Sequence, residues 1–477
     1  ARNLVFYIKQ IINFLRGNRL QNWKKLNKEI LNFKNGNKEK KKILIATSAG
    51  GLRSSLVLES LIGSTLNYKG CDVEFLLCDG ILPTCIMGSI HSTDENEYNK
   101  NGSKFLCDSC FKVSNNYLEK LNLNINKFSN FINDHEIKQI DNLEIDKLSF
   151  SEIKKYKYKN ISVGEHAYAG ALRYYAKTEI SEEKHSKKIL NSYLRAALFT
   201  YISVENLFKH KKFDEVILNH GIYVPQGIIN EYARKNKINV STWCAGYRKN
   251  SFCFTRGDTY HRSLINEPNS NWENIEISER ISNKIKLYLN SRLKGSKDWI
   301  FFHKNPSFDS KKFFEENKID PSKPIIGLAT NVLWDAQIDY PSNFFSGMME
   351  WIYFTIDHFK KNHNLQLLIR VHPAEVNETK PSRQKVVEEI LKKYGKLPSN
   401  IILIPPENNI STYSIFEKCS SVIIYGTKMG IELSAMKKLV IVCGEAFIRN
   451  KKLGIDVENI DQYKEILNKI ENLNYTT

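Results

Sequence analysis

Short apolar segments alternate with longer amphipathic ones from residue 42 onward, and this alternation restricts the fold more than any other feature of the chain. Residues 42–48 (KILIATS) are apolar and β-branched, as in a strand, residues 54–68 have helical character, and residues 71–79 (CDVEFLLCD) predict a second strand. Strand–helix–strand units build parallel sheets with helices on both faces. We therefore expect an α/β fold.

The alternation continues through both halves of the chain. In the first half it predicts helices at 165–177, 187–209, 226–236 and 272–293, and strands at 214–221 and 238–246. In the second half it predicts strands at 323–331, 365–371, 400–405, 421–425 and 439–444, separated by helices. This pattern predicts two Rossmann-like domains that face a cleft, with ligands outside the carboxyl ends of the strands.

A length of 477 residues suits two domains better than one. We predict a basic amphipathic helical segment at 1–40, a first domain at 41–295, a connection at 296–322, a second domain at 323–460 and a C-terminal helix at 461–477. Residues 85–160 are polar and rich in Asn and Lys, which indicates an insertion outside the core of the first domain.

The net charge of +18 is concentrated at the N-terminus, because residues 1–42 alone carry +10. The remaining charge is small for a body of this size, so we expect no nucleic-acid partner. Residues 1–40 combine apolar side chains at helical spacing with Lys and Arg. Such a segment suits either peripheral contact with an anionic membrane or packing against the protein.

The sequence carries no secretory signal and no apolar run near the roughly 20 residues that span a bilayer. Its nine cysteines do not form a disulfide scaffold. We expect a cytoplasmic protein, with any peripheral contact at the inner face of the membrane.

Four cysteines form a constellation of their own. Cys107 and Cys110 make a CxxC pair, and Cys78 and Cys85 precede it in the chain. Structural zinc sites commonly combine a CxxC pair with two further thiolates, although Cys78 and Cys85 do not themselves form a second CxxC. A structural zinc site, a redox or disulfide pair, and ordinary thiols are all compatible with this pattern.

Two strand ends of the second domain favour an anionic ligand. Arg370 ends one predicted strand and is followed by His372 and Pro373, which place positive charge and hydrogen-bond donors at the strand end. Two strands later, a glycine-containing turn leads directly into a helix, where free backbone amides suit a nucleotide phosphate. The turn and the first part of the helix include Gly426, Thr427, Gly430 and Glu432. Glu432 is placed to accept a hydrogen bond from a ribose or sugar hydroxyl.

These segments resemble a known family. The stretches 368–373 (LIRVHP), 401–406 (IILIPP), 422–435 (VIIYGTKMGIELSA) and 440–445 look like the capsule polysaccharide biosynthesis family, a group of GT-B glycosyltransferases that includes bacterial Kdo transferases. The resemblance extends over about residues 215–450 and is firmest over 365–445. A more distant similarity links these stretches to bacterial sialyltransferases and teichoic-acid glycerophosphotransferases.

The resemblance implies roles for individual residues. It places His372–Pro373 and Gly426–Thr427 at the phosphates of a CMP- or UDP-linked sugar, with Asn331 and Asp335 in the same cleft. In the first domain, the family's glycine-rich loop corresponds to Gly50 and Gly51, which follow the first strand.

The acceptor is expected on the side of the first domain. The glycine pair is followed by a cation, and a predicted hairpin at 246–261 is dense in aromatic and basic side chains that suit a sugar or charged acceptor. The candidate acceptor or cleft-loop residues are Gly50, Gly51, Arg53, Arg248, Tyr260 and His261.

Glycosyl transfer with inversion requires a base that takes the proton of the acceptor hydroxyl. His220 and Asp79 each end a predicted strand and precede a glycine, and Glu165 opens a predicted helix. We rank His220 first, Asp79 second and Glu165 third as the catalytic base. Without a DxD motif at a strand end, we expect catalysis to need no metal cofactor.

The sequence thus predicts a glycosyltransferase that moves a sugar from a nucleotide donor to a capsule- or lipopolysaccharide-type glycan, which is lipid-linked in one version of this hypothesis. A CDP-polyol phosphotransferase of teichoic-acid type and a sugar epimerase of GT-B fold are alternatives. A basic nucleic-acid-binding or scaffold protein is the alternative without catalysis.

Overall fold

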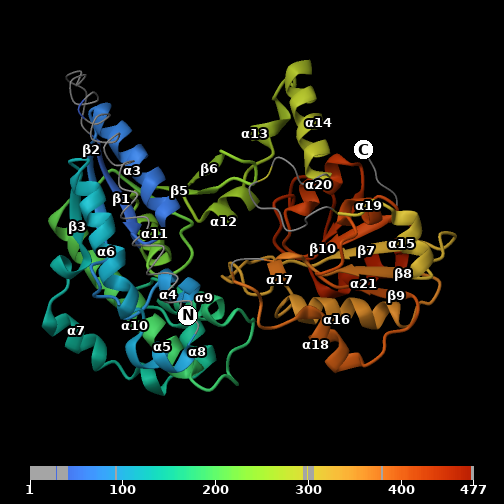
Figure 1. Ribbon diagram of the computed structural model, residues 1–477, viewed down its shortest axis with the longest axis horizontal. Coiled ribbons are helices and arrows are strands. Elements are labelled where there is room, and N and C mark those ends of the chain that lie inside the picture. Colours follow the sequence, from blue (N-terminus) through green and yellow to red (C-terminus); the bar gives the residue numbers. More distant parts are fainter. Residues whose placement is uncertain are drawn as a thin grey trace.

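Two six-stranded sheets, each in its own domain, organise the chain in the computed structural model (Figure 1). The structure describes residue 28 and residues 41–91, 94–293, 298, 306–377 and 380–473. The predicted helical segment at 1–40 lies outside the described residues except for Lys28, and so does part of the predicted connection.

The first sheet has the strand order β3-β2-β1-β4-β5-β6. All neighbouring strands are parallel except β5 and β6, which form an antiparallel hairpin. The strands are β1 (Lys42–Ser48), β2 (Asp72–Leu77), β3 (Asn124–Lys127), β4 (Glu215–Asn219), β5 (Asn239–Ala245) and β6 (Phe252–Arg256).

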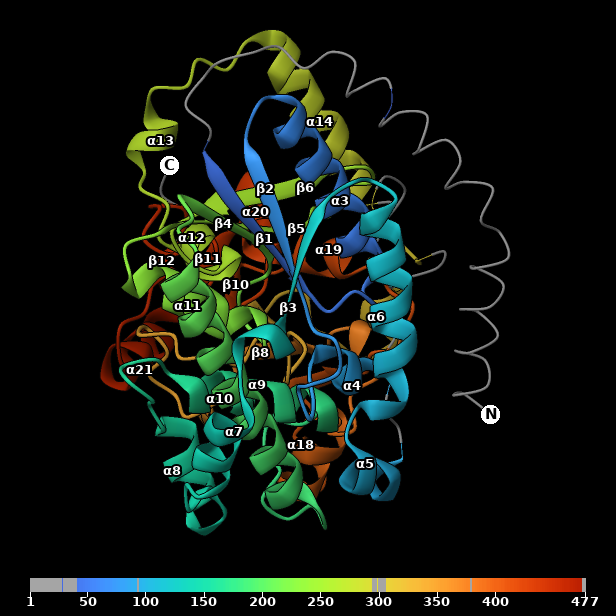
Figure 2. The same cartoon turned by 90° about the vertical axis from the view of Figure 1, so that its left-hand side faces the viewer.

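Helices cover both faces of this sheet, as its continuous apolar strands require. Leu44 and Ala46 of β1 pack with α9, α10 and α11, whereas Ile43 and Ile45 pack with α3 and α6 on the opposite face (Figure 2). The helices are α3 (Arg53–Tyr68), α4 (Ile86–His91), α5 (Glu95–Asn101), α6 (Lys104–Glu119), α7 (Asp134–Asp141), α8 (Phe150–Lys155), α9 (Val163–Tyr175), α10 (Ser186–His210), α11 (Gln226–Lys235), α12 (Tyr260–Ile265), α13 (Ser270–Glu273) and α14 (Glu279–Leu293).

The segment 85–160 is more deeply integrated than the sequence indicates. Its strand β3 pairs with β2 and extends the sheet, and Phe128 and Ile153 are fully buried in the core. The prediction that this segment lies outside the core is therefore wrong. The sequence pattern for this strand is weak, because β3 is a four-residue edge strand (NINK) and polar side chains are tolerated on the open side of an edge strand.

The second sheet has the order β12-β11-β10-β7-β8-β9 and is parallel throughout. Its strands are β7 (Ile325–Ala329), β8 (Gln366–Arg370), β9 (Ile401–Ile404), β10 (Ser421–Ile424), β11 (Leu439–Val442) and β12 (Ile455–Asp456). The two-residue strand β12 has no counterpart in the prediction, because so short a strand leaves no periodic pattern.

Helices also cover both faces of the second sheet (Figure 1). Apolar side chains of α16, α18 and α21 pack on one face, and those of α15, α19 and α20 pack on the other. The helices are α15 (Ser310–Glu316), α16 (Met348–Phe359), α17 (Ala374–Asn377), α18 (Val386–Tyr394), α19 (Thr412–Phe416), α20 (Met429–Ala435) and α21 (Ile460–Lys469).

Both sheets have the same strand order. If the strands of each domain are numbered from its own first strand, the order is 3-2-1-4-5-6 in both, the arrangement of the Rossmann fold. The predicted α/β fold with two Rossmann-like domains is confirmed.

Two predicted segments differ in detail. The helix expected at 272–293 is interrupted, since α13 ends at Glu273 and α14 begins at Glu279. The predicted connection at 296–322 contains the helix α15. Throughout the part of the chain that the structure describes, no helix combines the length and the hydropathy needed to cross a membrane.

Candidate functional site between the two domains

A Rossmann-like sheet changes its strand order between its first and fourth strands, and ligands bind at this switch point beyond the carboxyl strand ends. In the first domain the switch point lies between β1 and β4, which end at Ser48 and Asn219. In the second it lies between β7 and β10, which end at Ala329 and Ile424. The loops that follow β4 and β7 contact each other, so the two switch points face each other across the domain interface.

His220 lies at the switch point of the first domain, directly after β4. Its backbone has a left-handed φ of 58°, an uncommon conformation that turns the chain sharply into Gly221. The imidazole packs edge-to-face on Tyr260 at a centroid distance of 5.0 Å. Burial lowers the pKa of His220 to about 4, an effect that the Asp335 carboxylate opposes. The ring is therefore neutral at physiological pH and able to accept a proton.

Asp335, from the loop after β7, connects the two domains. Its Oδ1 accepts from the Tyr223 hydroxyl at 2.7 Å and from Arg173 Nη1 at 2.6 Å. The Tyr223 hydroxyl also accepts from the amide of Ala336 at 2.8 Å. Although surrounding protein acts to raise the pKa of Asp335, the Arg173 guanidinium and the Tyr223 hydroxyl lower it overall. Because its side chain is 50% exposed, this carboxylate is both ionised and accessible.

Tyr260 and His261, predicted on the acceptor side, extend this cluster along α12. The His261 ring lies 4.2 Å from that of Tyr260 and 5.8 Å from that of Phe447 in the second domain. Burial lowers the pKa of His261 to about 4, again opposed by Asp335. Two neutral histidines thus lie within the electrostatic reach of one carboxylate.

The other predicted bases have different surroundings. Glu165 Oε1 accepts from Arg262 Nη2 at 3.0 Å and from the amide of Asp339 at 2.9 Å, so it bridges the domains near the cluster with its carboxylate engaged. Asp79 follows β2 and accepts from the hydroxyl and amide of Ser129, which ties it to the segment beside β3. The structure brings His220 and Glu165 to the interface but engages Asp79 with Ser129.

Arg370 has a different environment from the predicted one. It is 2% exposed, and its guanidinium donates to the carbonyls of Pro405 and Asn408 at 2.6 and 2.9 Å and to Thr412 Oγ1 at 3.2 Å. Burial lowers the pKa of Arg370 to about 10. These contacts hold the loop after β9 in place.

His372 lies where β8 ends, beside Pro373. Its backbone amide donates to Thr330 Oγ1 at 3.0 Å, which joins the loops after β8 and β7. Its Nδ1 accepts from the amide of Ala374 at 3.1 Å, which helps to orient the ring.

The glycine-containing turn after β10 lies at the switch point of the second domain. A Cβ on Gly426 would lie 3.2 Å from the Glu445 carbonyl oxygen and 3.7 Å from Asn331 Nδ2, so the turn closes against the loop after β7. Thr427 Oγ1 accepts from the amide of Met429 at 3.3 Å. Gly430 serves packing, since a Cβ there would lie 2.7 Å from Ile424 Cδ1.

Glu432 is engaged in an ion-pair network. It is 3% exposed and accepts from Arg292 Nε at 2.8 Å, Lys428 Nζ at 2.6 Å and the Tyr413 hydroxyl at 2.7 Å. Burial acts to raise its pKa, but the two cations lower it overall. Lys428 also lies 4.0 Å from the centroid of the Tyr247 ring. The network joins α20 to α14 and the β5–β6 hairpin.

The remaining predicted loop residues contact the segment between β2 and β3 or the surface. A Cβ on Gly50 would overlap Ser114 of α6, and the amide of Gly51 donates to Cys110 Sγ at 2.9 Å. Arg53 begins α3 and is exposed. Arg248 is also exposed, and its backbone pairs with Asp298 away from the histidine cluster.

The sequence analysis missed Arg173, Tyr223 and Phe447. Tyr223 follows His220 in the loop after β4, so its position at a strand end was a usable signal. Arg173 belongs to α9 and reaches the site through packing within the first domain, whereas Phe447, in the loop after β11, reaches it through the packing of one domain on the other.

The fold and this interface define a two-domain protein of Rossmann-like halves with facing switch points. No family model matches the chain, and no curated protein is significantly similar to it in sequence.

Solved structures give low-identity neighbours. KpsC from Thermosulfurimonas dismutans, a beta-Kdo 2,4 transferase, is 12% identical with a TM-score of 0.36 over 52% of this chain and 75% of that chain. The UDP-GlcNAc 2-epimerase from Neisseria meningitidis, solved with UDP-GlcNAc, is 11% identical with a TM-score of 0.27 over 90% of this chain and 91% of that chain. S. aureus MnaA, solved with UDP, is 11% identical with a TM-score of 0.25 over 90% and 88%. The fold assignment rests on this chain's own strand order.

Proposed function

We propose that the chain is a glycosyltransferase that moves a sugar from a CMP- or UDP-linked donor to a cell-surface glycan. The donor nucleotide would bind at the switch point of the second domain, around Asn331, His372 and Gly426. The acceptor would bind at the switch point of the first domain, beside His220. The observation that carries the proposal is the neutral His220 at one switch point, within the electrostatic reach of Asp335 from the other.

The chemistry follows from this placement. A nitrogen of His220 takes the proton of the acceptor hydroxyl as its oxygen forms the new bond to the anomeric carbon of the sugar. The bond from that carbon to the nucleotide phosphate breaks, and the phosphate leaves with the electron pair. The imidazolium that forms is favoured by the Asp335 carboxylate, so the site supports the proton transfer at the moment it occurs.

Arg173 and Tyr223 position Asp335 for this role. Both contact its Oδ1, which leaves the second oxygen of a half-exposed carboxylate toward solvent or ligand. Because these contacts cross between domains, they also favour the domain arrangement in which donor and acceptor would meet.

The experiment is a donor panel of CMP-, UDP- and GDP-sugars together with CDP-glycerol, tested for transfer and hydrolysis. His220→Ala is expected to reduce kcat by about 100-fold or more, with donor affinity little changed, because a general base contributes roughly 10² to 10⁴ in rate. His363→Ala, at an exposed position outside the interface, is the matched control and should behave as wild type. An unaltered kcat in His220→Ala would rule out this base, and transfer of glycerol phosphate alone would assign the phosphotransferase activity instead.

A second candidate, epimerisation of a nucleotide sugar, is favoured by one observation. An epimerase removes a proton and returns one to the opposite face, which calls for two acid–base groups. His220 and His261 are both neutral and both interact with Asp335. Incubation of UDP-GlcNAc without an acceptor separates the two candidates, since only an epimerase would convert it to an isomer with the nucleotide still attached.

A further inference from the structure

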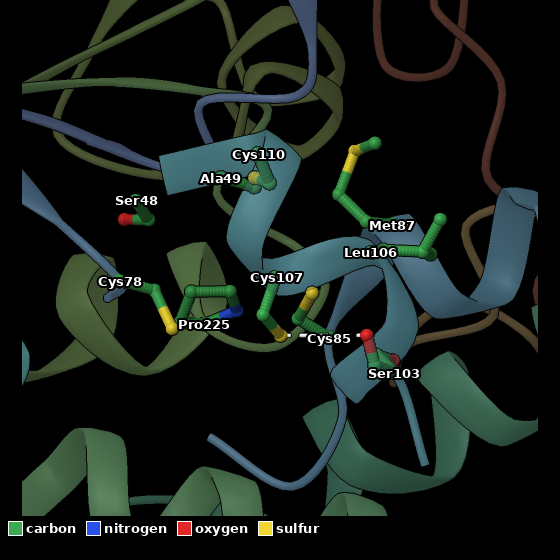
Figure 3. Close-up of a pocket in the computed structure, with 10 residues that line it drawn as sticks. All are labelled: Ser48, Ala49, Cys78, Cys85, Met87, Ser103, Leu106, Cys107, Cys110 and Pro225. Atoms are coloured by element: carbon green, nitrogen blue, oxygen red, sulfur yellow. Dashed lines mark hydrogen bonds between the residues drawn. The ribbon is translucent and has the colours of Figure 1, made fainter. Parts of the chain in front are cut away.

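Four cysteines from three parts of the first domain line one small cavity (Figure 3). Cys78 follows β2, Cys85 precedes α4, and Cys107 and Cys110 lie one turn apart on the same face of α6. The cavity has a volume of about 20 Å³, enough for one water-sized sphere.

Backbone amides are directed at the sulfur atoms. The amide of Gly51 donates to Cys110 Sγ at 2.9 Å, and that of Gly80 donates to Cys78 Sγ at 3.4 Å. A neutral thiol is a weak acceptor, whereas a metal-bound thiolate is stabilised by such outer N–H donors.

A buried thiol of the second domain differs from Cys78 and Cys110 in its hydrogen bonding. Cys419, a fully buried residue of the second domain, donates its thiol proton to the carbonyl of Ile415 in its own helix turn. This is the pattern of a cysteine that serves as a small apolar side chain. Cys78 and Cys110 of the cavity instead accept hydrogen bonds at their sulfurs, from the loops after β2 and β1.

We propose that Cys78, Cys85, Cys107 and Cys110 bind one zinc ion as four thiolates. Each thiol releases its proton to solvent as its sulfur donates an electron pair to the metal, with no change in oxidation state. Among the described residues, no three His, Cys, Asp or Glu side chains already meet at one metal position. Binding therefore requires several of the four cysteine side chains to move together, among them Cys107, whose thiol donates to the carbonyl of Ser103 at 3.4 Å.

The proposed ion would connect the end of β2 and the starts of α4 and α6. Through the Gly51 amide on Cys110, it would also hold the loop after β1, which lies at the switch point of the first domain. A tetrathiolate site with four protein ligands leaves no open position, so its role is structural. The proposal does not depend on which sugar chemistry the protein performs.

The first test is metal analysis of the purified full-length chain together with replacement of the metal by Co²⁺. We expect about one zinc per chain and, with Co²⁺, the visible absorption of a tetrahedral thiolate site. Zinc far below one equivalent, or iron with labile sulfide in its place, would overturn the proposal.

The second test assigns the ligands. Cys107→Ser and Cys110→Ser are expected to lower the zinc content severalfold, whereas Cys71→Ser, a partly buried cysteine of the same domain outside the cavity, should retain it. If the cavity variants do not fold, stepwise thiol modification of the wild-type protein gives the answer, because zinc release should follow modification of the four cavity cysteines. Full zinc content in both cavity variants, or release that follows other cysteines, would contradict the assignment.

Discussion

A buried carboxyl in the first domain allows a sharp test of the structure. Glu59 of α3 is fully buried against β5, and its Oε1 accepts from Trp243 Nε1 at 2.8 Å. Its Oε2 and the Thr47 hydroxyl are also buried, and among the described residues neither atom makes a hydrogen bond of standard geometry. The Thr47 hydroxyl and the Trp243 N–H both favour the ionised carboxylate, whereas burial favours the neutral acid and has the larger effect.

The expected magnitude follows from the pKa. Burial raises the pKa of Glu59 from 4.5 to about 7, against opposing effects of Thr47 and Trp243. Each unit corresponds to about 1.4 kcal/mol, so the whole shift is worth about 3 kcal/mol. Because the folded state binds this proton more tightly than the unfolded state, this stabilisation is fully present below pH 4.5 and is lost as the pH rises through 7.

The perturbation is Glu59→Gln, which keeps an acceptor for Trp243, offers an N–H to Thr47 and cannot ionise. We expect the free energy of unfolding of wild type to fall by about 3 kcal/mol more than that of the variant between pH 4.5 and 7.5. Urea unfolding at several pH values measures this difference. Contributions from His220 and His261, whose lowered pKa values destabilise the fold as the pH falls, are common to both proteins and cancel.

Glu273→Gln, at an exposed position, is the control and should follow the wild-type curve. If the curves of wild type and Glu59→Gln run parallel over this range, the carboxyl is not neutral in the folded protein and the argument is refuted.

Two further changes test the contacts around the site. Arg370→Met is expected to destabilise the second domain by about 2–4 kcal/mol in urea unfolding, because it removes the buried donor of the Pro405 and Asn408 carbonyls. A variant with normal stability but weakened nucleotide binding would assign this side chain to the ligand instead. Tyr223→Phe is expected to lower the free energy of unfolding by about 1–3 kcal/mol, because it removes hydrogen bonds at the domain interface. It should also speed hydrogen exchange of the Ala336 amide at least severalfold. Unchanged exchange would show that this contact does not form in solution.

The elements that the sequence predicted well are those with strong periodic patterns. Strands β7 to β11 are continuous apolar runs bounded by turn residues, so the local pattern is sufficient to find them. The strand β3, by contrast, has four mostly polar residues, and its place in the sheet is decided by its pairing with β2. The local pattern thus explains why β7 to β11 were predicted, and the dependence on tertiary pairing explains why β3 was not.

In the candidate site, too, some features follow from the local sequence and others only from tertiary packing. A titratable residue next to a glycine at a strand end, such as His220, is visible in the sequence because strand ends are local features. The partners of such residues are not visible. Arg370 and Glu432 have the residue types expected for a nucleotide site, yet the structure engages one with the loop after β9 and the other with Arg292, far away in the sequence.

The sequence by itself determined the class of fold and the set of loops in which functional groups gather, because both follow from the order of strands and helices along the chain. Only the tertiary structure decided that the loops after β4 and β7 meet, that Asp335 pairs with Arg173, and that four cysteines line one cavity. The physical reason is the distance along the chain over which each effect acts. Periodicity and turn chemistry act over a few residues, whereas the charge, burial and partners of a side chain depend on segments that packing brings to it from elsewhere in the chain.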